Sequence, residues 1–210
     1  MDDHDHDHDH DHGYGHHDGH GHAARPSPLA RWAQRFADVS VHSGGRLALR
    51  EAPLLSQLNV RAVARPDRPE LPAVNAVAEW GGAHVLGLGP DEWLIVSAPD
   101  TAGRLEADLL AVDPPSARWL GAVVDVSAQR TTLVASGPAV RDLLAHGCAL
   151  DLDPTVFGVG RCAQTMLAHA QVILWHPAPD EFRILVRASF ASYLAAWLLD
   201  AATELGTPAI

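Results

Sequence analysis

The stretch "LGPDEWLIV", residues 88–96, sets two carboxylates side by side, Asp91 and Glu92, next to the indole of Trp93. Paired carboxylates can act as a general acid and a general base when burial or a like-charged neighbour raises the pKa of one of them. Pro90 presets the dihedral of a turn and an aspartate can bond its own backbone there, so both acids are expected at an exposed turn between two strands. Because such a turn supplies no burial, the pattern predicts a structural hairpin rather than a catalytic pair.

The other side chains that could take part in catalysis or metal binding show no spacing typical of an active site. The histidines of the body form no HExxH motif, and no two lie at metal-ligand spacing on one face. They are His42, His84, His146, His169 and His176. Cys148 and Cys162 have neither metal-ligand nor redox spacing, which is typical of reduced core cysteines, and the glycine runs at 87–89 and 158–161 are too short for phosphate loops. The sequence therefore predicts no catalytic, cofactor-binding or metal-ligating residues in the body.

Closely spaced side chains that could bind a metal occur only in the first 22 residues, "MDDHDHDHDHDHGYGHHDGHGH". They hold nine of the 14 histidines, seven aspartates and four glycines, and almost nothing that could be buried. Such a segment cannot offset an ordering entropy of roughly 1–2 kcal/mol per residue, so residues 1–22 are expected to be a disordered tail. In an extended chain the alternate histidines from His4 to His12 face one way, and such a strip binds zinc, nickel or copper weakly. An adventitious or solubilising role and a biological metal role both stay open.

Charge and composition limit the class of partner. The 26 acids and 15 basic residues give a net charge of −11, and without the seven aspartates of the tail the body carries only −4. A body with no basic field cannot hold a nucleic-acid backbone, so no nucleic-acid partner is expected. The sequence shows neither a signal peptide nor the apolar run of about 18 residues that spans a bilayer, so we expect a cytoplasmic protein without membrane contact.

A repeat organises the elements around these residues. Residues 90–111 and 179–200 match without gaps at a constant offset of 89. Pro-Asp-Glu falls on Pro-Asp-Glu, Trp93 falls on Phe182, and a helical pattern of leucines follows in both copies. An ungapped match from turn to strand to helix favours duplication over chance similarity.

Two units of the same kind are expected. The second, about residues 120–205, has the pattern ββ-α-βββ-α, with strands "GAVVDVS" and "RTTLVAS", helix "PAVRDLLAHG", strands near 161–169, 171–176 and 182–188, and a final helix. The first, about residues 46–115, is a degraded version with strands near 46–51 and 57–63, a hairpin over 83–98 and a helix over 101–112. We predict an α+β fold in which residues 46–210 form one duplicated domain, preceded by a linker or N-terminal extension over 23–45.

Two packing features of the second unit can be predicted. Asp125 and Arg130 lie near the connection of its first two strands and are expected to form an ion pair. The last helix has apolar residues beyond its core-facing stripe, so it is expected to meet a second surface, either the other lobe or a partner chain. The predicted stripe is Phe190, Tyr193, Leu194, Trp197, Leu198 and Ala201, and the apolar residues outside it are Ala191, Ala195 and Leu199.

Four segments, in order, resemble the gamma subunit of bacterial heterotetrameric sarcosine oxidase: "LGPDEWLIV", "VDVSAQRTTLVASGPAVRDLLAHGCALDL", "FGVGRCAQTMLAHAQVILW" and "FRILVRASFASYLAAWLLDA". The similarity covers nearly all of residues 46–204 and leaves the tail outside. That subunit is similar to the folate-binding aminomethyltransferase fold of the glycine cleavage T protein, a duplication of two β2-α-β3-α units with exchanged first strands. The run from Asp125 to Pro138 resembles the Asp-x-Ser strand and following Gly turn of the T protein.

The resemblance implies a non-catalytic structural subunit of a complex that demethylates sarcosine oxidatively to glycine, with hydrogen peroxide and 5,10-methylenetetrahydrofolate or formaldehyde as products. It implies alpha, beta and delta subunits as partners, FAD, FMN, NAD and tetrahydrofolate held by other subunits, and no cofactor bound by this chain. T proteins carry a further C-terminal barrel that helps to enclose folate, whereas this sequence stops at Ile210, so folate binding by this chain alone is not expected.

Two other functions stay open. The first is a stand-alone folate-binding protein of the same fold, either methyl-transferring or iron–sulfur-related. The iron–sulfur relatives carry a Lys-Gly-Cys-aromatic signature, and "GRCAQT" around Cys162 lacks the lysine and the aromatic residue. The second is a metal-binding module defined by the tail.

Overall fold

The structure, a computed structural model, describes residues 26–62, 71–111 and 120–205. In chain order these residues form η1 (Ala30–Trp32), α1 (Ala33–His42), β1 (Ala48–Ala52), β2 (Ser56–Ala62), β3 (Val77–Trp80), β4 (Ala83–Gly89), β5 (Glu92–Ser97), α2 (Ala102–Ala111), β6 (Leu120–Asp125), β7 (Arg130–Ser136), α3 (Val140–Ala145), β8 (Arg161–Leu167), β9 (Ala170–Ala178), β10 (Glu181–Arg187) and α4 (Ala188–Thr203). The predicted disordered tail, residues 1–22, lies outside the described residues.

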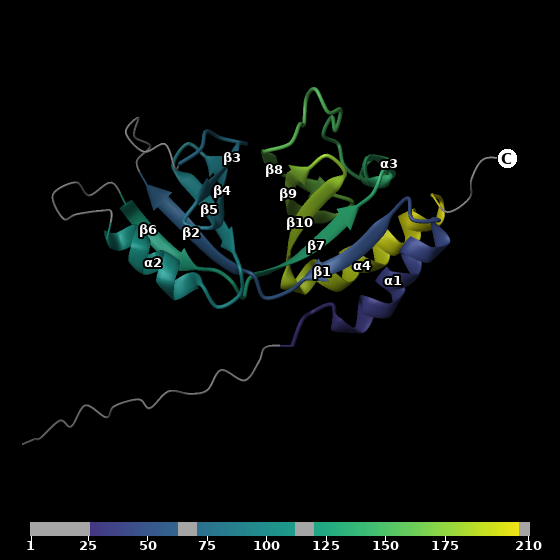
Figure 1. Cartoon of the computed structure of the whole chain (residues 1–210), viewed down its shortest axis with the longest axis horizontal. Helices are drawn as coiled ribbons and strands as arrows, with labels where there is room; N and C mark the ends of the chain where they lie inside the picture. The colour runs from purple at the N-terminus through teal and green to yellow at the C-terminus, as the bar shows by residue number, and fades with distance from the viewer. Residues whose placement is uncertain (1–25, 63–70, 112–119, 206–210) are drawn as a thin grey trace, which may run out of the picture.

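Two five-stranded sheets form the centre of the molecule, and helices cover their outer faces (Figure 1). Sheet A has the strand order β1-β7-β10-β9-β8, and sheet B has the order β3-β4-β5-β2-β6. The sheets stand like the two arms of a V, and the chain crosses between them from β1 to β2 and from β6 to β7. This arrangement of antiparallel sheets and helices confirms the predicted α+β class.

The two units exchange their first strands. β1, from the first unit, pairs with β7 in sheet A, and β6, from the second unit, pairs with β2 in sheet B. This is the exchange that the resemblance implied. Because each sheet contains strands from both units, neither sheet can be completed by one unit alone.

The repeat has two different offsets along the chain. β5 and β10 begin at Glu92 and Glu181, 89 residues apart as predicted, but β2 and β7 begin at Ser56 and Arg130, only 74 residues apart. The second unit is longer in its middle, where α3 and a loop separate β7 from β8. In the first unit, residues 71–76 ahead of β3 hold no helix. The strand β3 in this part of the first unit was not predicted from the sequence.

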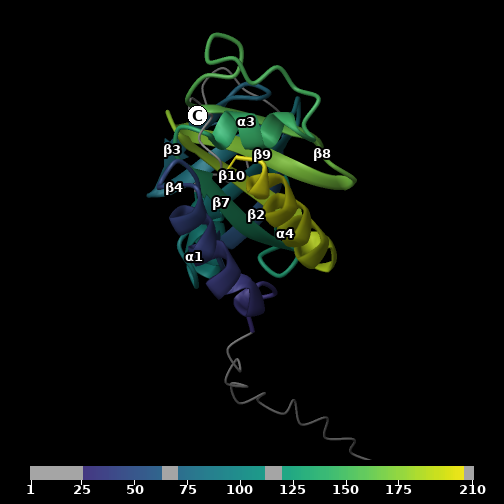
Figure 2. The same cartoon turned by 90° about the vertical axis from the view of Figure 1, so that its right-hand side faces the viewer.

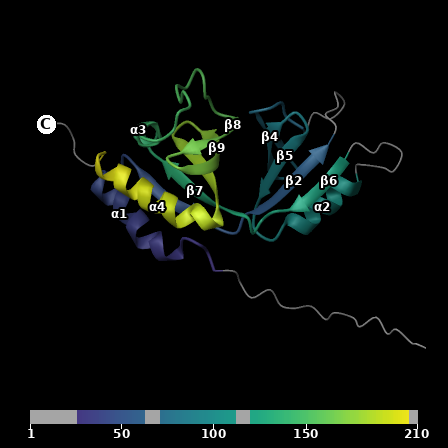
Figure 3. The same cartoon turned by 180° about the vertical axis from the view of Figure 1, so that it is seen from behind.

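Helices cover the outer face of each sheet. On sheet B, α2 packs against β2 and β6, and its Leu105 and Leu109 enter an apolar cluster with Leu58 and Val60. On sheet A, α1 and α4 lie side by side (Figures 2 and 3), and α3 contacts α4. Of these described helices, none has both the length and the apolarity needed to span a membrane.

The buried face of α4 differs in part from the predicted stripe. Phe190 and Tyr193, which were predicted to face the core, are 46% and 38% exposed. The helix packs on β10 with one side and against α1 with another, so its second surface is a helix of the same chain. The buried residues of α4 are Ala191, Leu194, Ala195, Leu198, Leu199, Ala201 and Ala202.

The helix α1 lies within residues 23–45, for which the sequence analysis expected only a linker or N-terminal extension. Phe36 and Val39 of this helix are buried, and so is Leu29 just before it. All three belong to the same apolar core as Leu133 and Phe182 of sheet A. This segment therefore packs as part of the folded core.

The inner faces of the two sheets are joined by a third apolar cluster. Because side chains alternate along a strand, each sheet presents one set of residues to its helices and the other set to the opposite sheet. Backbone hydrogen bonds join the two sheets along one side of this cluster, where Cys162 N donates to Asn75 O at 3.1 Å and Val77 N donates to Gly160 O at 2.9 Å. The buried residues between the sheets are Leu86, Leu94, Val96, Cys162, Ile173, Trp175 and Leu185.

His146 ties the end of α3 to the residue after α4. Its Nδ1 lies 2.7 Å from the carbonyl oxygen of Asp142, and its Nε2 lies 3.2 Å from the carboxylate of Glu204. These contacts, with the Asp142 carbonyl as the largest cause, raise the pKa of His146. A group with a raised pKa stabilises the fold below its unfolded pKa, and this contribution is lost as the pH rises through its folded pKa.

We therefore expect His146→Gln to destabilise the protein in acid but not in alkali. Denaturant unfolding at about pH 5.5 should show a loss of less than about 1 kcal/mol, because the pair is exposed. In alkaline solution above its folded pKa, the imidazole is neutral in both states and the two proteins should unfold alike. A difference that is as large at the higher pH would show that the contact does not depend on the imidazolium charge.

Candidate functional site

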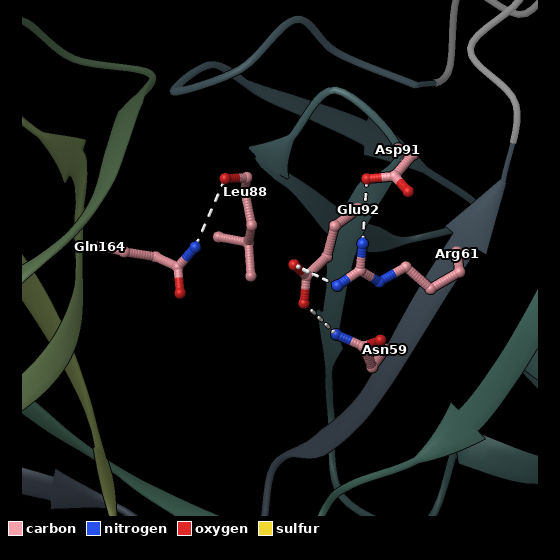
Figure 4. Close-up of polar contacts among 6 residues, drawn as sticks. All are labelled: Asn59, Arg61, Leu88, Asp91, Glu92 and Gln164. Atoms are coloured by element: carbon pink, nitrogen blue, oxygen red, sulfur yellow. Dashed lines mark hydrogen bonds and ion pairs between the residues drawn. The ribbon is translucent and has the colours of Figure 1, made fainter.

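Asp91 and Glu92 occupy the turn and first strand residue of the hairpin between β4 and β5, as predicted. Arg61 of β2 donates to Asp91 Oδ1 at 2.9 Å and to Glu92 Oε2 at 3.1 Å (Figure 4). Asn59 Nδ2 donates to Glu92 Oε1 at 2.9 Å. The Asp91 side chain is 63% exposed. One guanidinium thus binds both acids and fastens the hairpin to the neighbouring strand, which is a structural role.

The histidines of the described residues lie apart, and no group of three His, Cys, Asp or Glu side chains in this part of the chain could hold a metal ion. The ring of His84 on β4 packs against Trp175 in a tilted arrangement with ring centroids 4.6 Å apart, and burial, followed by the charge of Arg183, lowers the pKa of His84. His176 is buried with its Nδ1 3.1 Å from the carbonyl oxygen of Phe157, and its ring stacks on Phe182 at 4.4 Å. Both rings are held by packing contacts.

Both cysteines are free. Cys162 is buried where β8 meets the residues before β3, and its thiol lies 3.5 Å from the Ala76 carbonyl and 3.7 Å from the Gly87 carbonyl. Burial raises the pKa of this thiol to about 11. Because the thiolate is the reactive form, Cys162 is inert at neutral pH. The prediction of a reduced core cysteine is confirmed for Cys162, while Cys148 is half-buried against the sheet A core.

The predicted ion pair between Asp125 and Arg130 is wrong. Asp125 Oδ1 accepts hydrogen bonds from the backbone N–H of Ser127 at 2.8 Å and from its hydroxyl at 2.5 Å. An aspartate at this place bonds the backbone two residues on, and this local turn uses the carboxylate that the ion pair required. Arg130 instead opens β7 in register with Arg187 of β10.

An open groove of about 300 Å³ lies on the inner face of sheet A, where β7 begins and β10 ends. Gln164, on its wall, reaches sheet B with its Nε2 3.4 Å from the Leu88 carbonyl oxygen (Figure 4). Two arginines and two glutamines are among the residues that line the groove, so it can hold an anion. We call it the arginine groove; its lining side chains include Arg130, Arg187, Gln164, Gln171, Met166 and Ile173.

The chain belongs to the class of proteins with an aminomethyltransferase-like fold. It resembles the structure of glycine cleavage system aminomethyltransferase T from Bartonella henselae with a TM-score of 0.55 and 14% sequence identity. The match covers 77% of this chain and 48% of that one. At this identity the likeness shows the fold alone.

Within that class, the chain belongs to the sarcosine oxidase, gamma subunit family, whose model matches residues 58–204. Sarcosine oxidase subunit gamma from Arthrobacter sp is 35% identical over 89% of this chain and 94% of the relative. The subunit from Corynebacterium sp. strain P-1 is 37% identical over 88% of this chain and 93% of the relative. A chain of heterotetrameric sarcosine oxidase from Corynebacterium sp. U-96, solved in complex with pyrrole 2-carboxylate, matches with a TM-score of 0.74 and 34% identity, covering 89% of this chain and 98% of that chain.

The described side chains between the two sheets do not fit tetrahydrofolate, which the T protein fold implies. Pockets for such ligands enclose most of the ligand and are lined by apolar side chains. Here the inner faces are filled by their own side chains, among them Leu86, Leu94 and Trp175. The arginine groove beside them has a volume of about 300 Å³ and is open, so it does not enclose a ligand.

Proposed function

We propose that this chain is the non-catalytic gamma subunit of a heterotetrameric sarcosine oxidase, and that other subunits carry out the oxidative demethylation of sarcosine. The observation that carries this proposal is membership of the gamma subunit family over residues 58–204. The described side chains support it, because the acid pair fastens a hairpin and the buried histidine and cysteine serve packing. A doubled, closely packed fold suits a scaffold.

The proposal extends to cofactors and location. FAD, FMN, NAD and tetrahydrofolate are assigned to the other subunits, because the space between the sheets here is filled. The expected partners are the alpha, beta and delta subunits, in the cytoplasm.

Co-purification tests the assignment. The tagged full chain, produced together with its cognate alpha, beta and delta subunits, should retain all three through affinity and size-exclusion steps. Sarcosine-dependent hydrogen peroxide formation should elute with that complex. A chain that elutes by itself while the flavoprotein subunits assemble without it would refute the proposal.

The acid pair provides a second test. We expect the double variant Asp91→Asn, Glu92→Gln to leave sarcosine turnover of the assembled oxidase within about twofold of the unmodified complex, because both acids serve an exposed turn. Steady-state peroxide assays at saturating sarcosine measure this. A loss of about 100-fold, the size expected for removal of a general acid or base, would show that the pair takes part in the chemistry.

A further inference from the structure

Two arginines face each other across neighbouring strands at one end of sheet A. Arg130 and Arg187 are direct partners in the antiparallel register of β7 and β10. Side chains at such positions have Cβ atoms roughly 4.5–5.5 Å apart, and like charges placed there destabilise a sheet. Burial, followed by the charge of Arg187, lowers the pKa of Arg130. The isolated chain therefore carries a like-charge pair that weakens its own fold.

No acid in the described residues forms an ion pair with either arginine. The charge of Glu92 raises the pKa of Arg130, but burial and Arg187 lower it by more. The Glu92 oxygens already bind Arg61 and Asn59. The backbone at the pair is also fixed, since Gln57 Nε2 donates to the Arg130 carbonyl at 3.2 Å. Within residues 26–62, 71–111 and 120–205, the pair is thus held in place without an acid bound to either guanidinium.

Exposed apolar side chains surround the arginine groove. Met166 lines the groove and is 44% exposed, and Leu54, 43% exposed, shares an adjoining hollow with Arg130. Aromatic residues, methionine and arginine are the types enriched in protein interfaces. The end of sheet A thus combines two charges that no described acid neutralises with exposed apolar side chains in and beside the groove.

We propose that this end of sheet A is the surface by which the chain docks to another oxidase subunit, and that the docked segment places an aspartate or glutamate carboxylate between Arg130 and Arg187. The inference rests on the proposed function, because it identifies the surface through which the chain would join the oxidase complex. A carboxylate can accept charge-assisted hydrogen bonds from two guanidiniums, and it removes the repulsion between them. An open groove of about 300 Å³ admits a side chain from a neighbouring surface, and apolar residues beside the acid would pack on Met166 and Leu54.

The test is the single variant Arg187→Glu, compared with Arg104→Glu as a control of equal charge change. Arg104 lies on α2, against the outer face of sheet B, and pairs with Asp108 at 3.0 Å. In the isolated full chain, Arg187→Glu converts the like-charge pair into a cross-strand ion pair, so its melting temperature should stay equal or rise. Its Kd for the complex of the other three subunits should rise at least about 10-fold, because the new glutamate places a carboxylate against the carboxylate of the docked segment. Arg104→Glu should bind within about twofold of the unmodified chain. Arg187→Gln, which removes the charge without reversing it, should lie between the two.

Opposite effects on stability and assembly distinguish docking from misfolding. Equal assembly of Arg187→Glu and the unmodified chain would overturn the proposal, and so would an equal loss for Arg104→Glu. If inorganic phosphate stabilises the unmodified chain but not Arg187→Glu, while both assemble equally, the groove holds a small anion instead. If the unmodified chain forms a dimer that Arg187→Glu abolishes, the occupant is a second copy. Failure of the unmodified chain itself to assemble would refute the proposed function, which is a separate result.

Discussion

Replacing Phe182 by alanine is expected to lower the free energy of unfolding by about 3–5 kcal/mol, the range for removal of a large aromatic side chain from a packed core. Phe182 is fully buried in the sheet A core. Its ring stacks on His176 at 4.4 Å and on Phe157 at 6.3 Å, and the Arg141 guanidinium lies 5.0 Å from its centre. Alanine at this position removes the contacts with all three neighbours. The surrounding backbone cannot collapse far enough to restore them.

The repeat supplies a matched position in the other sheet. Trp93, the counterpart of Phe182 at the offset of 89, is buried in the sheet B core and donates from Nε1 to the Pro72 carbonyl at 2.9 Å. Trp93→Ala should destabilise by a similar amount, whereas Phe190→Ala, at a half-exposed position, should cost less than about 1 kcal/mol. Urea unfolding of the three variants measures this. Comparable losses for Phe182→Ala and Phe190→Ala would contradict the packing described.

Removing residues 1–45 is expected to destabilise the protein strongly, whereas removing residues 1–22 should leave it unchanged. The longer deletion takes away Leu29, Phe36 and Val39, each of which contributes roughly 1.5–3 kcal/mol when buried. It also uncovers the side of α4 that packs on α1. We expect a loss of at least about 3 kcal/mol, a large part of the roughly 5–15 kcal/mol that stabilises a domain.

Thermal unfolding and assembly with the other subunits should be measured on both truncated chains. The shorter deletion also tests whether the tail defines a metal-binding module, because oxidase assembly and activity should not depend on it. Loss of activity after removal of residues 1–22 alone would give the tail a function. Equal stability of the two truncated chains would show that α1 is an appendage of the core.

Strands and helices of the repeat units were predictable because their patterns are local. Short runs rich in β-branched and other apolar residues marked β4, β5, β9 and β10, and the Pro-Asp-Glu turns marked both hairpins. The helix α1 was missed, although Leu29, Trp32, Phe36 and Val39 lie at spacings of three and four residues that indicate one apolar helical face. The strand β3 has only four residues, too few for a period to stand out.

Features that depend on pairing between distant segments could not be predicted from patterns. The exchange of β1 and β6 came from the resemblance, since periodicity does not state which strand pairs with which. The opposition of Arg130 and Arg187 is set by the register of β7 and β10 and has no sequence signature. The exposure of Phe190 and Tyr193 follows from how α4 shares its apolar surface between β10 and α1. The prediction that the chain contains no catalytic or cofactor-binding residue stays a prediction.

The central claim, that this chain is a scaffold without a reactive centre, is tested most directly by assaying the purified full chain alone. Its absorption spectrum should show no flavin, and added sarcosine should yield no hydrogen peroxide above the buffer, while the same chain assembled with the alpha, beta and delta subunits should turn over. Stoichiometric flavin on the isolated chain, or peroxide formed from sarcosine in the absence of the other subunits, would contradict the account.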